Sequence, residues 1–255
     1  DPVKNLSIGT NMSLRQMEKS CNIQLRSDAE NFYLFSAPLM LLFIYNRNRE
    51  EKQMNHYIKM ETNNFTAVHT SVQNSIINGK PVIRVVKQDK INQYDENTYA
   101  KVNNLLFHNG TIKVKMLSRL LPDAPDFARG FIGIVYRANI EDSEFESFYV
   151  RPTNGRNCSD AVRKSHGCQY FSYPGYTFSY FREYNITKYE APVDLALDEW
   201  FTLKAVIENE HAEFYLNGES VLVVNDMKHG RGDRGAIGIF VDIGTEAFIS
   251  DLKVI

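Results

Sequence analysis

The sequence predicts an all-β fold, a jelly-roll sandwich of two antiparallel sheets. From about residue 58, short apolar stretches with the period of strands follow one another to the C-terminus. Asn-Gly pairs, which supply the positive φ angles of tight turns, separate several of them, at Asn78, Asn109, Asn154 and Asn217. Almost no stretch has the period of a long helix. Many short strands joined by turns are typical of β-sandwiches and jelly rolls.

Each predicted strand is a short run rich in valine, isoleucine and aromatic residues and bounded by turn residues, a composition that fits a pleated, half-buried surface. The expected strands are 66–72, 82–86, 99–103, 110–117, 130–138, 145–151, 169–172, 176–181, 200–208, 212–216, 221–224, 236–242 and 247–255. Because side chains along a strand alternate between faces, one residue in two is expected in the core. The residues expected between the two sheets include Phe148, Val150, Leu203, Phe214, Leu216, Ile239 and Leu252.

Residues 1–57 carry mixed signals, and we expect them to form an N-terminal extension of uncertain structure before a domain at 58–255. Their main feature is an apolar run at 32–45, interrupted by Pro38. Its 14 residues are fewer than the roughly 20 needed to span a bilayer as a helix. Two interpretations stay open: one or two buried strands broken at Pro38, or an export or anchor segment through which the protein associates with a membrane.

Charge and cysteine content narrow the functional classes. The formal net charge is −2, with basic residues interspersed among acids, which gives no indication of nucleic-acid binding. Three cysteines are too few for a disulfide scaffold. Cys158 and Cys168 flank one polar loop, however, and either form a disulfide that closes it or are free thiols; Cys21 is left over. The disulfide fits the location that we expect, which is extracytoplasmic: periplasmic, cell-surface or secreted.

The stretch 145–156, which reads Phe-Glu-Ser-Phe-Tyr-Val-Arg-Pro-Thr-Asn-Gly-Arg, carries the clearest functional signal. By alternation, Phe148 and Val150 share one face of its strand while Tyr149 and Arg151 share the other. If the first pair faces the core, a phenol ring and a guanidinium stand together on the opposite face. Such a pair suits a sugar, because the ring stacks on the apolar face of the sugar and the guanidinium binds hydroxyls or a carboxylate.

Further polar residues extend this candidate site. Arg137 ends the preceding strand, and chain proximity suggests that it stands beside Tyr149. His166 lies in the loop between the two cysteines, Gln169 opens the following strand, and Arg182 extends one face of the next predicted strand, directly after its end. Arginine, histidine, glutamine and tyrosine together suit an oxygen-rich and even anionic ligand.

The sequence lacks the usual catalytic motifs. Its six histidines are scattered, with no pair at zinc-ligand spacing, and no nucleophile elbow, phosphate loop or dinucleotide fingerprint is present. We therefore expect no cofactor. Glu144 and Glu146 share a face, but it is the face of Phe148, which argues against an ordinary glycosidase with two carboxyls flanking the scissile bond. A calcium site built from separate acidic loops is the remaining alternative, with Asp123, Asp126, Asp142 and Asp242 as its candidate ligands.

Beyond the stretch 145–156, a series of residues in fixed order resembles a known group of domains. The series is Arg163, His166, Gln169-Tyr170, Pro174, Arg182, Tyr189-Glu190, Val193-Asp194, Glu199-Trp200, the segments 214–218 and 224–228, and 235–240.

Over roughly residues 58–255, the chain resembles the concanavalin A-like lectin/glucanase superfamily, and within it bacterial domains of the 3-keto-disaccharide hydrolase type. Trp200 and the hairpin 214–218 are shared with many laminin-G-like domains and indicate the fold alone. The stretch 145–156 with the later His166 and Gln169-Tyr170 is more specific. The resemblance implies a concanavalin A-like jelly roll and a function that involves carbohydrate.

These observations predict a domain that recognises an oligo- or polysaccharide on the concave sheet. A glycan-cleaving hydrolase or lyase in the same cleft is the alternative, and a structural or adhesion module without a small ligand is a second one. A carboxylate pair would favour hydrolysis, whereas a set of tyrosine, histidine, arginine and glutamine fits a binder or a lyase. The predicted ligand-binding residues are Arg137, Tyr149, Arg151, His166, Gln169 and Arg182.

Overall fold

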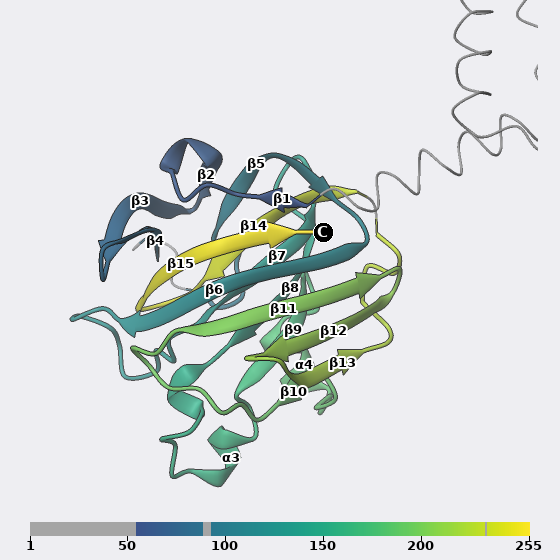
Figure 1. Ribbon diagram of the computed structural model, residues 1–255. Coiled ribbons are helices and arrows are strands. Elements are labelled where there is room, and N and C mark those ends of the chain that lie inside the picture. The colour runs from purple at the N-terminus through teal and green to yellow at the C-terminus, as the bar shows by residue number, and fades with distance from the viewer. Residues whose placement is uncertain (1–54, 89–92, 233) are drawn as a thin grey trace, which may run out of the picture. The chain divides into compact units, whose positions relative to one another are not determined.

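The computed structural model describes residues 55–88, 93–232 and 234–255, which form two antiparallel sheets packed face to face as a jelly-roll sandwich (Figure 1). The apolar run 32–45, Cys21 and all but the last residues of the predicted N-terminal extension lie outside these described residues. Within them, no helix is both long and apolar enough to cross a membrane.

One sheet has eight strands, seven of them in the order β13-β12-β11-β6-β15-β4-β3, with β1 paired to β15. Its strands are β1 (His56–Tyr57), β3 (Thr70–Ile77), β4 (Lys80–Lys87), β6 (Gly110–Leu120), β11 (Phe201–Glu208), β12 (His211–Leu216), β13 (Glu219–Val224) and β15 (Thr245–Val254).

The other sheet has seven strands in the order β10-β9-β8-β7-β14-β5-β2. Its strands are β2 (Phe65–Val68), β5 (Tyr99–Phe107), β7 (Ile132–Ala138), β8 (Phe145–Val150), β9 (Cys168–Tyr173), β10 (Glu190–Ala191) and β14 (Gly235–Val241). Short helical segments lie in the loops: η1 (Thr62–Asn64), η2 (Pro152–Asn154), α3 (Ala161–Lys164) and α4 (Phe178–Glu183).

The core lies between the sheets, where the alternate residues of both inner faces meet. Phe148 of β8 stacks on Phe214 of β12 across this space, with ring centroids 4.2 Å apart and the rings nearly parallel. All seven residues expected in the core are at most 5 % exposed, so this prediction is confirmed. Burial of such large apolar side chains is the main source of the stability of the fold.

The outer face of the seven-stranded sheet is also covered near its middle. The rings of Tyr149, Phe171 and Phe240 pack together there, with centroids 5.2–5.7 Å apart. The connection from β4 to β5 crosses this face: the Asp95 amide donates to Asp242 at 2.9 Å, and the Tyr173 hydroxyl donates to Glu96 at 3.3 Å. Residues 93–98 therefore occupy part of the surface on which we expected an open groove.

Two predicted strands differ from the structure. The predicted strand 176–181 is largely the helix α4, because its aromatic residues repeat at helical spacing: Tyr180 packs on Tyr184 with centroids 4.7 Å apart, and Phe181 is buried. The predicted strand 66–72 is two strands that belong to different sheets. The break comes at His69, whose φ of 46° turns the chain from β2 into β3.

Candidate functional site

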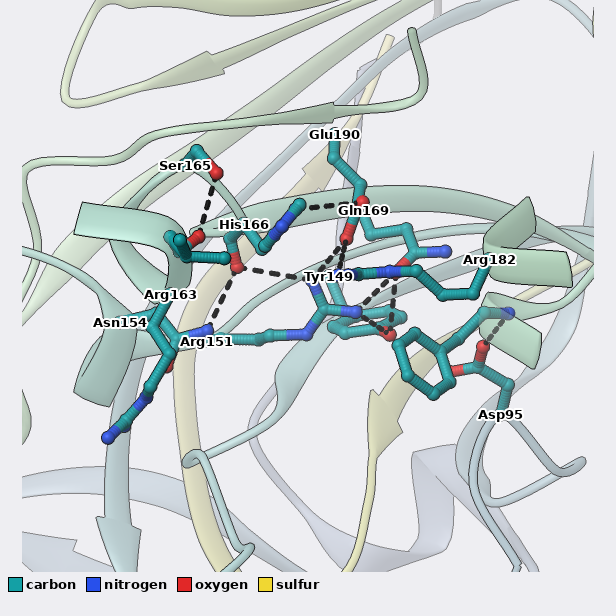
Figure 2. Close-up of polar contacts among 12 residues, drawn as sticks. Asp95, Tyr149, Arg151, Asn154, Arg163, Ser165, His166, Gln169, Arg182 and Glu190 are labelled. Carbon is teal, nitrogen blue, oxygen red and sulfur yellow. Dashed lines mark hydrogen bonds and ion pairs between the residues drawn. The ribbon is translucent and has the colours of Figure 1, made fainter. Parts of the chain in front are cut away.

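The buried carboxylate of Glu190 is the centre of a polar network at one edge of the seven-stranded sheet (Figure 2). Its side chain is 3 % exposed and accepts hydrogen bonds from Arg151 at 2.9 Å and from Arg182 at 3.2 Å. Nδ1 of His166 lies 2.9 Å from its second oxygen. One carboxylate thus faces two guanidinium groups and an imidazole.

Strand register assembles this network. Tyr149 of β8 pairs with Gln169 of β9, and Gln169 pairs with Glu190 of β10, so three polar side chains stand in one row across three strands. Arg151 follows directly after β8, where Pro152 begins the short helix η2. The β8–β9 and β9–β10 pairings thus bring residues from three separate segments together.

Arg151 is held on every side. Its guanidinium donates to the Tyr149 hydroxyl at 2.8 Å, to the Gln169 side-chain oxygen and to the His166 carbonyl at 3.1 Å. It also lies over the Tyr149 ring, 5.0 Å from the centroid. Burial lowers the pKa of Arg151, but nearby Tyr149 and Glu190 outweigh it, so the pKa lies above its ordinary value. The group is a permanent cation inside the protein.

The structure therefore brings together five of the six predicted ligand-binding residues, but not on an open face. Tyr149, Arg151 and Gln169 are 1 %, 5 % and 0 % exposed, so the expectation that they project into a groove is wrong. The start of α4 and Asp95 cover them, with the Phe178 amide donating to the Asp95 carboxylate at 2.5 Å. His166 and Arg182 remain accessible, with side chains 17 % and 42 % exposed.

Arg137 does not belong to this network. Tyr149 pairs with Gly133, so Arg137 lies four positions further along β7, and the expected neighbourhood with Tyr149 is wrong. Its φ of 55° marks an irregularity where β7 leaves the sheet register. The side chain instead donates to the His108 carbonyl at 2.9 Å and to Asn109 at 3.0 Å. These contacts give Arg137 a structural role in a distant loop.

Cys158 and Cys168 are free thiols in this structure. Cys168 opens β9 and is fully buried in the core, where burial raises the pKa of its thiol to about 12. The sulfur of Cys158 instead lies 3.5 Å from the Asp160 carbonyl within the loop.

The titratable groups near the network are poorly suited to proton transfer. Burial raises the pKa of Tyr149 well above its ordinary value, so the phenol stays protonated and is not a base. Burial also lowers the pKa of His166, which keeps this imidazole neutral at neutral pH. Asp95 has a pKa raised to about 6 by burial and by Asp242, but it is only 1 % exposed.

Other carboxylates are committed to the protein itself. Glu146, on the core face as expected, accepts from the Tyr170 hydroxyl at 2.7 Å and from the His229 amide at 3.0 Å. Asp242 pairs with buried Lys87, and Asp142 with Lys101. Among the described residues, no group of three or more histidine, cysteine, aspartate or glutamate side chains could hold a metal ion.

The accessible part of the region consists of aromatic rings and arginines, which we call the aromatic–arginine surface. Tyr94 and Phe127 are 37 % and 47 % exposed, with ring centroids 5.6 Å apart, and Tyr94 also lies 6.1 Å from Phe178. Arg182 lies over the Phe178 ring, 5.2 Å from its centroid. This surface is formed by Tyr94, Phe127, Arg129, Phe178 and Arg182.

Arg129 contributes a further guanidinium close to Tyr94. Within the described residues, its guanidinium donates hydrogen bonds only to backbone carbonyl groups. These are the carbonyls of Asp126, at 2.7 Å, and of Ala128, at 2.8 Å. Burial, followed by the positive charges of Arg163 and Arg151, lowers its pKa. Several guanidinium groups are therefore crowded around one place. Tyr94, Phe127 and Arg129 are not among the ligand-binding residues predicted from the sequence. They lie in loops without a strand pattern, and no sequence pattern indicates that these separate loops come together in the fold.

Comparisons with known proteins agree with this architecture. No family model matches the chain, and no curated protein does. Among solved structures, a carbohydrate-binding module, CBM66, from Bacillus subtilis is 13 % identical, with 75 % of this chain and 96 % of that one covered and a TM-score of 0.51. A protein of unknown function with a galectin-like fold, also from Bacillus subtilis, is 12 % identical over 79 % and 94 %, with a TM-score of 0.50. The chain has a concanavalin A-like lectin/glucanase fold.

In this concanavalin A-like sandwich, the aromatic–arginine surface lies on the outer side of the seven-stranded sheet. Phe131 connects it to the sheet, because its ring packs on Tyr94 at 6.0 Å and on Tyr149 at 5.9 Å. The exposed rings thus rest on the buried layer that contains Arg151. The surface is open to solvent, while the polar network below fixes its position.

Proposed function

We propose that this domain binds carbohydrate on the aromatic–arginine surface. The observation that carries the proposal is the set of partly exposed rings, Tyr94, Phe127 and Phe178, beside the guanidinium groups of Arg129 and Arg182. Aromatic rings stack on the apolar faces of sugar rings, and arginine donates several hydrogen bonds in a fixed geometry to hydroxyls and carboxylates. The combination provides both parts of a sugar site.

The charge distribution favours an acidic sugar. Arg151 and Arg182 share the single carboxylate of Glu190. Arg129 forms no ion pair within the described residues, and its pKa is lowered partly by neighbouring arginines. A carboxylate or sulfate on the ligand would relieve this crowding of positive charge and form charge-assisted hydrogen bonds.

The buried network acts as a support for this surface. Glu190 holds the guanidinium of Arg182 at 3.2 Å, and Arg182 in turn lies over Phe178. A side chain held in place loses less conformational entropy when a ligand binds, which improves affinity. Arg151 and Glu190 are therefore positioning residues rather than ligand contacts.

Binding is the function we put before cleavage. Hydrolysis of a glycosidic bond requires two carboxyls that flank the bond, about 5 to 10 Å apart. Asp95 and Glu190, the carboxylates beneath this surface, are buried and hydrogen-bonded within the protein. Exposed Asp126 and Glu183 lie on the two separate segments that carry Phe127 and Arg182. The similarity of the fold to a carbohydrate-binding module supports a role in carbohydrate recognition and leaves its ligand open.

A glycan array followed by calorimetric titration of the hits tests the proposal. Arg182→Gln should weaken binding of an acidic hit by about 1.5–3 kcal/mol, because it removes a charge-assisted contact from a partly exposed position. Arg231→Gln is the matched control, since Arg231 is exposed and its ion pair with Glu210, at 3.9 Å, is long. If both variants bind the acidic hit as tightly as the wild type does, the binding site lies elsewhere on the protein. Product analysis after incubation with each hit separates binding from cleavage.

A further inference from the structure

The outer face of the eight-stranded sheet carries a hollow that is separate from the polar network and from the aromatic–arginine surface described above. It measures about 280 Å³, which is close to the lower limit of small-ligand pockets. It crosses β11, β6, β15 and β4 and ends at the β3–β4 turn. We call it the Trp200 hollow; its lining residues are Ile77, Asn78, Lys80, Val82, Lys115, Trp200, Phe201, Thr202, Ser250 and Asp251.

The floor of the Trp200 hollow is apolar. Val82, Leu117 and Phe248 form a separate buried cluster on the outer face of this sheet, and half-buried Trp200 packs against it. Trp200 directly precedes β11, so the indole stands at the side of the hollow. A flat, half-buried indole beside an apolar floor is an arrangement that suits one face of a sugar ring.

A β-bulge supplies the polar side of the hollow. Ser250 pairs with Lys115 of β6, whereas Lys253 pairs with Lys113, so β15 contains one extra residue between them. Asp251 lies within this bulge with a φ of 51°. Bulges re-aim side chains and occur often next to binding sites. Here the carboxylate of Asp251 lies 3.3 Å from the Lys115 ammonium, and both side chains are at least half exposed.

We infer that the Trp200 hollow is a second carbohydrate site, which binds a neutral sugar ring. The indole provides the stacking surface, and the paired Lys115 and Asp251, with the Thr202 hydroxyl and the Asn78 amide, provide donors and acceptors for sugar hydroxyls. Lys115 and Asp251 neutralise each other, which leaves exposed Lys80, at the β3–β4 turn, as the one unpaired charge among the residues that line the hollow.

The size and the lining argue against other occupants. A stable protein interface buries about 800 Å² on each partner, far more than this hollow offers. An acyl chain would leave the lysines, the aspartate and the asparagine without hydrogen-bond partners. A single ring with hydroxyls at its edge satisfies both the apolar floor and the polar side.

Intrinsic fluorescence tests this inference directly, because Trp200 is the only tryptophan in the chain. The full chain is titrated with cellotetraose, laminaritetraose, xylotetraose and mannotetraose. We expect a saturable change of tryptophan emission with at least one of them. Absence of a saturable change with all four would overturn the inference.

Three variants identify the origin of the signal. Asp251→Asn tolerates the positive φ and Lys115→Gln keeps a donor, and each should weaken the fluorescence-detected affinity about tenfold, the usual effect of losing one hydrogen bond to a charged group. Arg231→Gln, an exposed position outside both proposed sites, should leave the isotherm unchanged. If both hollow variants, with wild-type circular dichroism, bind like the wild type, the fluorescence change does not report this site. The result is independent of the aromatic–arginine surface, which contains no tryptophan.

Discussion

Replacing Glu190 with glutamine should destabilise the domain severely, although the two side chains have nearly the same shape. The neutral amide no longer compensates Arg151, which is 6 % exposed on its side chain. Removing one partner of a buried ion pair costs about 3–5 kcal/mol, because the other charge stays buried. Arg182 contributes little to this cost, since its guanidinium is 42 % exposed and water can solvate it.

Urea unfolding measures this effect as a shift of the midpoint at constant slope. The total stability of a domain is about 5–15 kcal/mol, so the Glu190→Gln midpoint should fall by a large part of the wild-type value. Asp198→Asn is the matched control: it removes the carboxylate of an exposed ion pair with Arg119, and asparagine tolerates the φ of 61° at this position. That variant should lose no more than about 1 kcal/mol. Equal and small losses for both variants would refute the argument that Glu190 compensates a buried charge.

Two further predictions concern stability. Asp95 has its pKa raised from 3.8 to about 6 in the folded protein, so the stability linked to its protonation is present below pH 3.8 and is lost as the pH rises through 6. The stability of Asp95→Asn relative to the wild type should therefore fall by roughly 2.4 kcal/mol between pH 7 and pH 4 in urea unfolding. A constant difference across this range would contradict the assignment of the pKa. Phe214→Ala should cost about 3–5 kcal/mol in the same assay, because it removes the ring that stacks on Phe148 at 4.2 Å between the sheets, and a loss below about 1 kcal/mol would show that this contact is not part of the core.

Most of the sandwich can be predicted from the sequence because strand periodicity and turn residues are local signals. The alternation of Phe148 and Tyr149 correctly placed the first in the core and the second on the opposite face. The segment 176–181 was predicted as a strand because its aromatic residues suit strands, whereas its contacts repeat at helical spacing. Apolar runs this short fit either pattern, and tertiary contacts decide between them.

The candidate site was predictable only in part. The residues of β8 and β9 meet through pairing of neighbouring strands, which chain order suggests. Whether their outer face is open depends on residues 93–98 and α4, and nothing in the sequence indicates that these cover Tyr149 and Arg151. Glu190 lies on a two-residue strand, too short to give a pattern. Long-range placement of loops is therefore the part that sequence reasoning did not reach.

The most direct test of the central claim compares two forms of one ligand. An acidic oligosaccharide that binds the domain is compared with its methyl-esterified form, in which each carboxylate is replaced by a neutral ester, and both are titrated calorimetrically into the wild type and into Arg182→Gln. If the aromatic–arginine surface is the binding site, the wild type should prefer the acidic form by at least about tenfold, the effect of one charge-assisted contact, and Arg182→Gln should lose most of this preference. Equal affinities of both proteins for both forms would contradict the account.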